Sequence, residues 1–279
     1  MSLKTILTYL PNPKTAPDLL QLATKLARKH DAHLIGLSIV ARVPLYGVLA
    51  VEIPNDVIEK QRQAMREEVQ EVHRLFDKAV EKAGCRAEWR SYDAMYSDLA
   101  AEVISQAMTA DLTILSQEDN DPFDAWADLV PRVVMGCGRP VLVVPSAGTF
   151  TDVGKRPMIA WNASREAARA AFDAIPLIAD ADVVEILAVN PSERRGQESL
   201  SPGDDLAVSL ARHGLELEAA TSATSELKVG DELLSRLADR GCDLLVMGCY
   251  GHSRIRETLF GGATRHLLAH MTVPVLMSH

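Results

Sequence analysis

The sequence is poor in aromatic residues and has no excess of positive charge. Aromatic residues make up 5% of its 279 residues, whereas 47% are hydrophobic and 24% are charged, and the formal net charge at pH 7 is -9. This composition is typical of globular proteins, and the length favours two domains over one. Because a negative protein repels polyanions, we expect neither a nucleic acid nor an anionic membrane surface as a partner.

Cysteines and long apolar runs are also scarce. The cysteines are Cys85, Cys137, Cys242 and Cys249, with no CxxC pair among them. A chain of this size does not need disulfides, so the sequence predicts a reducing, cytoplasmic location. No segment approaches the roughly 18 consecutive apolar residues of a membrane-spanning helix, and the first residues lack the pattern of a signal peptide. We therefore expect neither secretion nor membrane insertion.

Several motifs that mark enzymes are missing. The chain contains neither GxGxxG nor GxxxxGK[ST], so a dinucleotide-binding or motor-type site is disfavoured. It has no GxSxG elbow, and no arrangement of Ser, His and an acid can be assembled from the sequence. We therefore expect no catalytic residues and no dedicated hydrolase.

Short apolar runs alternate with segments of helical periodicity, which is the pattern of βα units in a parallel sheet. In the first half, strands are expected near 4–9, 33–40, 85–91, 111–116 and 140–145, with helices near 15–30, 55–83, 97–109 and 125–136. In the second half, strands are expected near 157–161, 183–189, 215–221, 243–247 and 273–278, with helices near 164–180, 204–213, 229–240 and 262–270. The same order returns, so the sequence predicts an internal repeat.

Two matched segments align the repeat. Residues 110–115 (ADLTIL) match 242–247 (CDLLVM), and 139–144 (RPVLVV) match 273–278 (VPVLMS). The stretch between the copies is rich in small and turn-forming residues, which is typical of a linker. We expect a first domain over 1–146, a linker over 147–155 and a second domain over 156–279.

A glycine-rich loop follows the fourth strand of the second copy. Gly248 and Gly251 come directly after this strand, where a missing Cβ lets the backbone approach a ligand. Gly261 and Gly262 open a helix whose free N–H groups favour phosphate. Ligands of open α/β sheets bind at the carboxyl ends of the strands, so this loop is predicted to hold a polyphosphate.

The spacing Gly248-x2-Gly251-x9-Gly261 resembles the ATP-binding pattern of the universal stress protein family, and the order of elements extends the resemblance over the whole chain. The resemblance implies two tandem Rossmann-like (adenine nucleotide alpha hydrolase-like) domains, each a five-stranded parallel sheet flanked by helices. It implies ATP or AMP as ligand, with Mg, and at most slow ATP hydrolysis, in a cytoplasmic regulator of the stress response. The family has Ser or Thr after the third glycine, where this chain has Gly262; Thr264 could replace that hydroxyl from one turn on.

The resemblance also implies a set of ligand-binding residues. Trp161, Asn162 and Ala163 correspond to the segment that meets adenine and ribose, with Asn162 where the family usually has Asp. The rest of the implied site consists of Val189, Met247, Gly248, Gly251, His252, Arg254, Gly261, Gly262, Ala263 and Thr264. Arg254, with Arg256, is expected to pair with phosphates.

The first copy differs at the corresponding loop. Residues 116–124 (SQEDNDPFD) contain no glycine and carry four acids, so a phosphate would be repelled there. We expect a first domain that binds no nucleotide. The apolar strands 140–145 and 273–278 would be exposed edges unless they are paired, which predicts that the two domains form an internal pseudo-dimer like the family's usual dimer, with a homodimer as a further option.

Three alternatives stay open. A metal site at Cys249, His252, His266 and His270 is weighed because the last two are four residues apart on one helix, but it lacks a carboxylate pair or a second cysteine. A nucleotide-independent scaffold or chaperone-like protein, which binds a partner or an apolar ligand, would fit the departures at Gly262 and Asn162. An adenylate-forming or ATP-hydrolysing enzyme would need an acid, a base or a substrate pocket that the sequence does not reveal.

Overall fold

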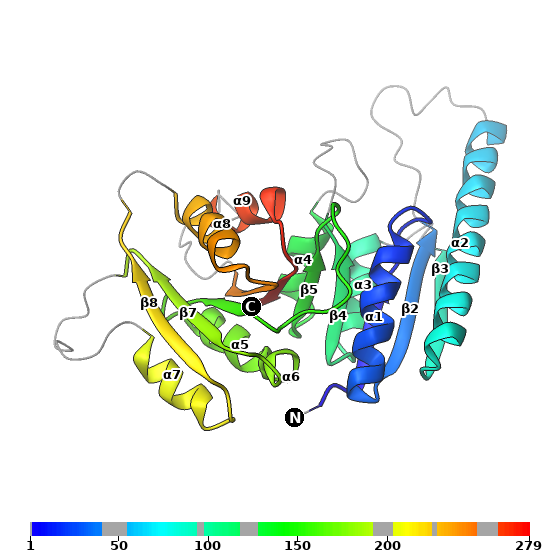
Figure 1. The fold of residues 1–279 in the computed structure, drawn as a ribbon. Coiled ribbons are helices and arrows are strands. Elements are labelled where there is room, and N and C mark those ends of the chain that lie inside the picture. Colours follow the sequence, from blue (N-terminus) through cyan, green and yellow to red (C-terminus); the bar gives the residue numbers. More distant parts are fainter. Residues whose placement is uncertain are drawn as a thin grey trace. The chain divides into compact units, whose positions relative to one another are not determined.

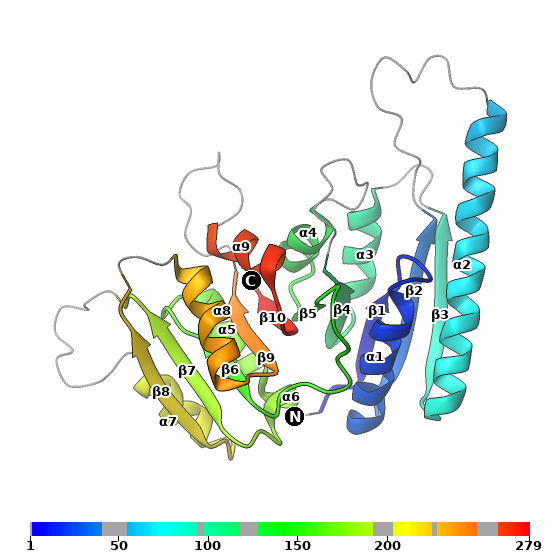
Figure 2. The ribbon, with the colours of Figure 1, turned by 45° about the horizontal axis from the view of Figure 1, so that its top comes forward.

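The computed structural model describes residues 2–40, 55–93, 98–117, 128–191, 203–224, 228–249 and 262–279. These residues form two compact units, Leu3–Cys137 and a second built mainly from Gly138–His279. Within each unit a central sheet is flanked by helices (Figures 1 and 2). The expected α/β class, with a mostly parallel sheet, is confirmed.

The first unit alternates strands and helices along the chain. Its elements are β1 (Thr5–Tyr9), α1 (Ala16–His30), β2 (His33–Val40), α2 (Asn55–Ala83), β3 (Ala87–Asp93), α3 (Leu99–Ala107), β4 (Leu112–Ser116) and α4 (Leu129–Gly136). The strands lie in the order β3-β2-β1-β4 and every pair is parallel. α1 packs with α2, and α3 packs with α4 (Figure 1).

The second unit repeats this order and adds two strands, β5 and β10. Its elements are β5 (Val141–Val144), β6 (Pro157–Ala160), α5 (Arg165–Asp173), α6 (Ile175–Ile178), β7 (Val184–Val189), α7 (Asp204–Ala211), β8 (Leu217–Ser222), α8 (Val229–Arg240), β9 (Leu244–Gly248), α9 (Gly262–His270) and β10 (Val275–Ser278). The strands lie in the order β5-β10-β9-β6-β7-β8. The order β8-β7-β6-β9 is that of β3-β2-β1-β4 in the first unit.

The five strands expected over 156–279 form a parallel sheet in the order β10-β9-β6-β7-β8. Two features differ from what was expected. β5, expected in the first domain, belongs to the second unit, where it pairs antiparallel with β10, with Leu142 opposite Leu276. This pairing covers the apolar edge that each strand would otherwise expose. The single helix expected over 164–180 is two helices, α5 and α6, separated at Ala174. Pro176 explains the break, since a proline is tolerated in the first turn of a helix but not in its interior.

The cores of the units are formed by the apolar runs that predicted the strands. All four residues of β5 are buried, as are Leu244, Leu245 and Val246 of β9. In the first unit Ile6, Leu7 and Ile114 are fully buried on adjacent strands. No helix among the described residues is both long and apolar enough to cross a membrane. The domain boundaries expected at 146 and 156 stay predictions.

Candidate functional site

The strand order of the second unit reverses direction between β6 and β9. From β6 the chain proceeds through β7 to β8, and then returns to place β9 on the other side of β6. In open α/β sheets, ligands bind outside the carboxyl ends of the strands at such a switch point. The sequence-predicted residues Trp161, Asn162, Met247 and Gly248 all lie at or just beyond these two strand ends.

A hydrogen-bonded turn connects β6 to α5. The N–H of Trp161 donates to the carbonyl oxygen of Leu187 (2.8 Å), which anchors the turn to β7. The side-chain oxygen of Asn162 accepts from the N–H of Ser164 (3.1 Å), and Ala163 takes a left-handed backbone conformation, with φ 57°. Trp161 is half-buried and Asn162 is exposed.

Ser164 caps the helix that starts at this turn. Its hydroxyl oxygen accepts from the N–H of Ala167 (3.1 Å), which satisfies one of the free donors of the first turn of α5. Glu166 in the same turn is buried and pairs with Arg165. Burial raises the pKa of Glu166, but hydrogen bonds from Arg165, from its own backbone N–H and from Ser164 outweigh it and lower the pKa. The carboxylate is therefore ionised, which suits the positive end of a helix dipole.

Gly248 is required by the packing of α5 against β9. A Cβ at this position would collide with the backbone of α5, at the N of Ala167 and the carbonyl carbon of Glu166, and would lie 2.7 Å from the Glu166 oxygen. The sequence suggested that this glycine lets the chain approach a ligand. In the structure the space that a side chain would need is filled by the protein itself.

Met247 and Val189 line neighbouring strand ends. Met247 is buried in β9, opposite Ala160 of β6 and Met277 of β10. Val189 is half-buried at the end of β7 and pairs with Ser222. The carboxyl ends of β6, β7 and β9, where Trp161, Val189 and Met247 lie, are therefore neighbours in the sheet.

Much of the glycine loop lies outside the described residues. The loop residues outside the described ranges include Gly251, His252, Arg254, Arg256 and Gly261. Gly262 and Ala263 begin α9, and the structure describes only the backbone of these two residues. Thr264 is buried, with 5% of its surface exposed. In the first unit, residues 118–124 of the acidic loop are likewise outside the described residues.

The histidines weighed as metal ligands have other contacts. His266 Nε2 lies 2.6 Å from Asp231 Oδ1 of α8, and the rings of His266 and His270 stack with centroids 4.4 Å apart. Cys249 is buried, and its Sγ lies 3.4 Å from the carbonyl oxygen of Ser278. Within the described ranges, no group of three or more His, Cys, Asp or Glu side chains could hold a metal ion. His252 is not among those residues.

Sequence reasoning missed several contacts at the same edge of the sheet. The hydroxyl of Ser278 donates to Asp173 (2.9 Å), and His279 Nδ1 lies 3.0 Å from the carbonyl oxygen of Cys249. Asn190, with φ 47°, accepts from the N–H of Thr224 (2.8 Å). These contacts join segments far apart in the sequence, so no local pattern announces them.

Comparisons with known proteins agree with this architecture. A model of the universal stress protein family matches residues 155–279. The fold is similar to that of a universal stress protein from Archaeoglobus fulgidus DSM 4304, with 15% identity, a TM-score of 0.71, and coverage of 98% of this chain and 95% of that chain. It is also similar to a protein from Pseudomonas aeruginosa UCBPP-PA14, provisionally described as a universal stress protein, with 13% identity, a TM-score of 0.60, and coverage of 99% and 93%.

A more distant match has a nucleotide bound. The universal stress protein from Archaeoglobus fulgidus in complex with dAMP covers 51% of this chain and 98% of its own, at 11% identity and a TM-score of 0.34. A likeness at that level carries no argument about binding here. Among curated proteins, none matches the sequence closely enough to count as a relative.

Proposed function

This chain belongs to the universal stress protein family through residues 155–279, and we propose that its second unit binds an adenine nucleotide, ATP or AMP, with Mg²⁺ as a companion ion. The proposal rests on one observation. The pattern Gly248-x2-Gly251-x9-Gly261 starts at the carboxyl end of β9, next to β6, where the strand order reverses. That is the place where open α/β sheets bind their ligands.

In this proposal one group of residues contacts adenine and ribose, and a second group contacts the phosphates. The turn at Trp161, Asn162 and Ala163 and the end of β7 at Val189 would hold adenine and ribose, above Met247. The exposed amide of Asn162 offers a donor as well as an acceptor to a ribose hydroxyl. The phosphates would lie against Gly248, Gly251, His252, Arg254, Gly261, Gly262, Ala263 and Thr264.

The nucleotide would act as a signal. The proposal gives the protein a regulatory role in the stress response of the cytoplasm, with at most slow hydrolysis. The first unit, whose corresponding loop is acidic, would bind no nucleotide. The antiparallel pairing of β5 with β10 supports an internal pseudo-dimer of tandem domains 1–146 and 156–279.

Calorimetric titration of the full chain with ATP and with AMP, in the presence of magnesium, tests the proposal. Gly251→Asp adds charge and bulk to the glycine loop and should abolish binding. Gly84→Asp is a matched control, because Gly84 has φ +64° and open space around it, and Asp tolerates that conformation. We expect one site per chain in the wild type and in Gly84→Asp. A wild type that binds neither nucleotide would overturn the proposal.

A second candidate function is favoured by the packing around Gly248 and Thr264. Contact with α5 accounts for Gly248 without any ligand, and the buried Thr264 has little surface to offer a phosphate. These observations fit a nucleotide-independent scaffold or chaperone-like protein that binds a partner or an apolar ligand. The same titration separates the two functions, since the scaffold predicts no heat with either nucleotide.

A further inference from the structure

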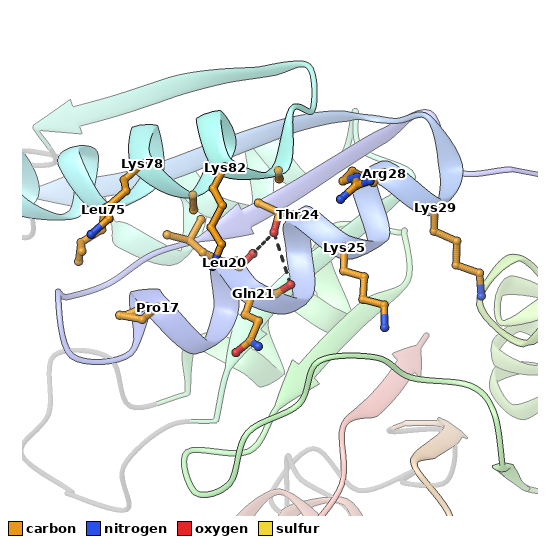
Figure 3. A pocket seen from close by; sticks show the side chains of 12 residues that line it. Pro17, Leu20, Gln21, Thr24, Lys25, Arg28, Lys29, Leu75, Lys78 and Lys82 are labelled. Atoms are coloured by element: carbon orange, nitrogen blue, oxygen red, sulfur yellow. Dashed lines mark hydrogen bonds between the residues drawn. The ribbon is translucent and has the colours of Figure 1, made fainter.

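The first unit contains a groove between α1 and α2, far in sequence from the glycine loop. It encloses about 860 Å³, a volume within the usual range of small-molecule sites. Its residues on α1 run from Pro17 to Lys29, a helical length of about 18 Å at 1.5 Å per residue. Figure 3 shows the side chains that line it.

Five cationic side chains border this groove. Lys25, Arg28 and Lys29 come from α1, and Lys78 and Lys82 come from α2. All five are exposed, and no acidic residue is among those that line the groove. Because the whole chain carries a net charge of -9, this is a local reversal of sign.

The floor of the groove is apolar. Leu20 is buried at 2% exposure, and Leu75, Ala79 and Ala83 are half-buried. The hydroxyl of Thr24, also in the lining, donates to the carbonyl oxygen of Leu20 (2.6 Å) and lies 3.4 Å from that of Gln21 (Figure 3). Since this hydroxyl is held by its own helix, the floor offers a ligand apolar contact.

Helix dipoles explain only part of the cation cluster. Cations in the last turn of a helix are stabilised by the partial negative charge there, and this effect falls off within one turn. Arg28 and Lys29 lie in the last turn of α1, as does Lys82 in α2. Lys25 and Lys78 lie more than a turn from the helix ends, beyond the reach of this effect.

We propose that this groove binds a single-chain anionic amphiphile, specifically the anion of a long-chain carboxylic acid. The apolar chain would lie on the half-buried Leu75, Ala79 and Ala83. The carboxylate would pair with the lysines of one or both walls. The pairs Lys25/Lys29 and Lys78/Lys82 each have the i,i+4 spacing that puts two side chains on one helix face, so both walls offer a row of cations.

The test is calorimetric titration of the full chain with dodecanoate, kept below its micellar concentration. Dodecyltrimethylammonium has the same chain and the opposite charge. We expect one dodecanoate site per chain, affinity that falls as salt screens the lysines, and no binding of the ammonium compound. Equal binding of both compounds, or no binding of dodecanoate, would overturn the proposal.

Variants locate the site. Lys78→Glu/Lys82→Glu should weaken dodecanoate binding by about tenfold or more, equivalent to about 1.4 kcal/mol. Lys60→Glu/Lys228→Glu makes the same change in net charge at exposed lysines outside the lining and should leave the affinity unchanged. Ala79→Trp should block the floor without altering charge. Thermal unfolding of each variant checks that the fold is retained.

Two further outcomes decide the proposal. Unaltered dodecanoate affinity in the Lys78→Glu/Lys82→Glu variant would overturn it. Binding to anionic phospholipid vesicles without binding to free dodecanoate would also overturn it, because the ligand would then be a membrane surface. The result is independent of the nucleotide site, because ATP titration of the same lysine variants tests the second unit separately.

Discussion

Asp243 occupies in the second unit the position that Asp111 occupies in the first, since each carboxylate binds two backbone N–H groups that lead into the neighbouring strand. Asp111 accepts from Lys4 (2.8 Å) and Thr5 (3.0 Å). Asp243 accepts from Lys155 (2.8 Å) and Arg156 (2.9 Å). The residue directly before β4 thus fixes the start of β1, and the residue directly before β9 fixes the start of β6. This shared contact supports the internal repeat beyond the shared order of elements.

The two oxygens of Asp243 have separate partners, which makes the residue sensitive to a conservative change. Asp243→Asn replaces one oxygen with an NH₂ group that cannot accept a hydrogen bond and would face a backbone N–H. We expect the free energy of unfolding to fall by about 1 to 2 kcal/mol, measured by denaturant titration. Asp239→Asn, an exposed site on α8, is the control and should change little. Equal stability of the two variants would contradict this role.

Gly248 gives a second prediction, because the atoms that crowd it belong to the backbone. In Gly248→Ala the new methyl group would meet the main chain of α5 at Glu166 and Ala167, and strand and helix must separate to admit it. Overpacking of this kind typically costs about 1 to 3 kcal/mol. We expect a loss at or above the upper end of that range in denaturant titration.

Gly230→Ala is the matched control for Gly248→Ala. A methyl group at Gly230 would lie 2.8 Å from Cδ2 of His266, but a side chain can move where a helix backbone cannot. Gly230 also lies in α8, where alanine has the better helix propensity. This variant should keep or gain stability. If Gly248→Ala is as stable as Gly230→Ala, the packing of α5 on β9 does not explain the glycine.

Ser164 gives a third prediction at the same edge of the sheet. Ser164→Ala removes the oxygen that accepts from the N–H of Ala167, and loss of such a cap costs about 1 kcal/mol. Ser164→Asn retains an acceptor for this N–H and adds no charge beside the Glu166 carboxylate, so it should be close to the wild type in stability. Thermal or denaturant unfolding compares the three proteins. If Ser164→Ala has the same free energy of unfolding as the wild type, the cap contributes nothing to stability.

The sequence predicts the elements of this fold well because their signals are local. The alternation of apolar and polar residues places α8 at 229–240 and α9 at 262–270, which are the bounds observed. The expected β2 at 33–40 also agrees residue for residue. The single helix expected over 164–180 was wrong because Pro176 divides it into α5 and α6, and this error affects no other element.

What the sequence does not predict depends on contacts between distant segments. The antiparallel sense of β5 and β10 follows from which edges meet, and both strands look alike as apolar runs. The demand for a glycine at 248 comes from α5, some 80 residues earlier in the chain. The packing of α1 against α2 brings Lys25 and Lys78 to one groove, and no local pattern in either helix predicts this.

The last prediction concerns the thiol of Cys242, which precedes β9. Burial, together with the nearby carboxylates of Glu185 and Asp243, raises its pKa from 9.0 to about 11 against the opposing effect of Arg240 and Arg156. A thiol reacts as the thiolate, so at pH 8 the reactive fraction should be about a hundredfold below that of an ordinary cysteine. Alkylation of the native protein with iodoacetamide, followed by mass spectrometry of its peptides, measures this protection.

The same shift has a defined effect on stability. Because the folded protein favours the neutral thiol, Cys242 contributes stability below pH 9.0, and this contribution is lost as the pH rises towards about 11. Cys242→Ser, which cannot ionise in this range, should therefore lose less stability than the wild type between those values. Cys85 is an internal control for alkylation, since its pKa is also raised by burial but it is only half-buried and should react first. Cys242 labelling at the rate seen in denaturant would show that the strand start is open to solvent, and the assigned burial would then be wrong.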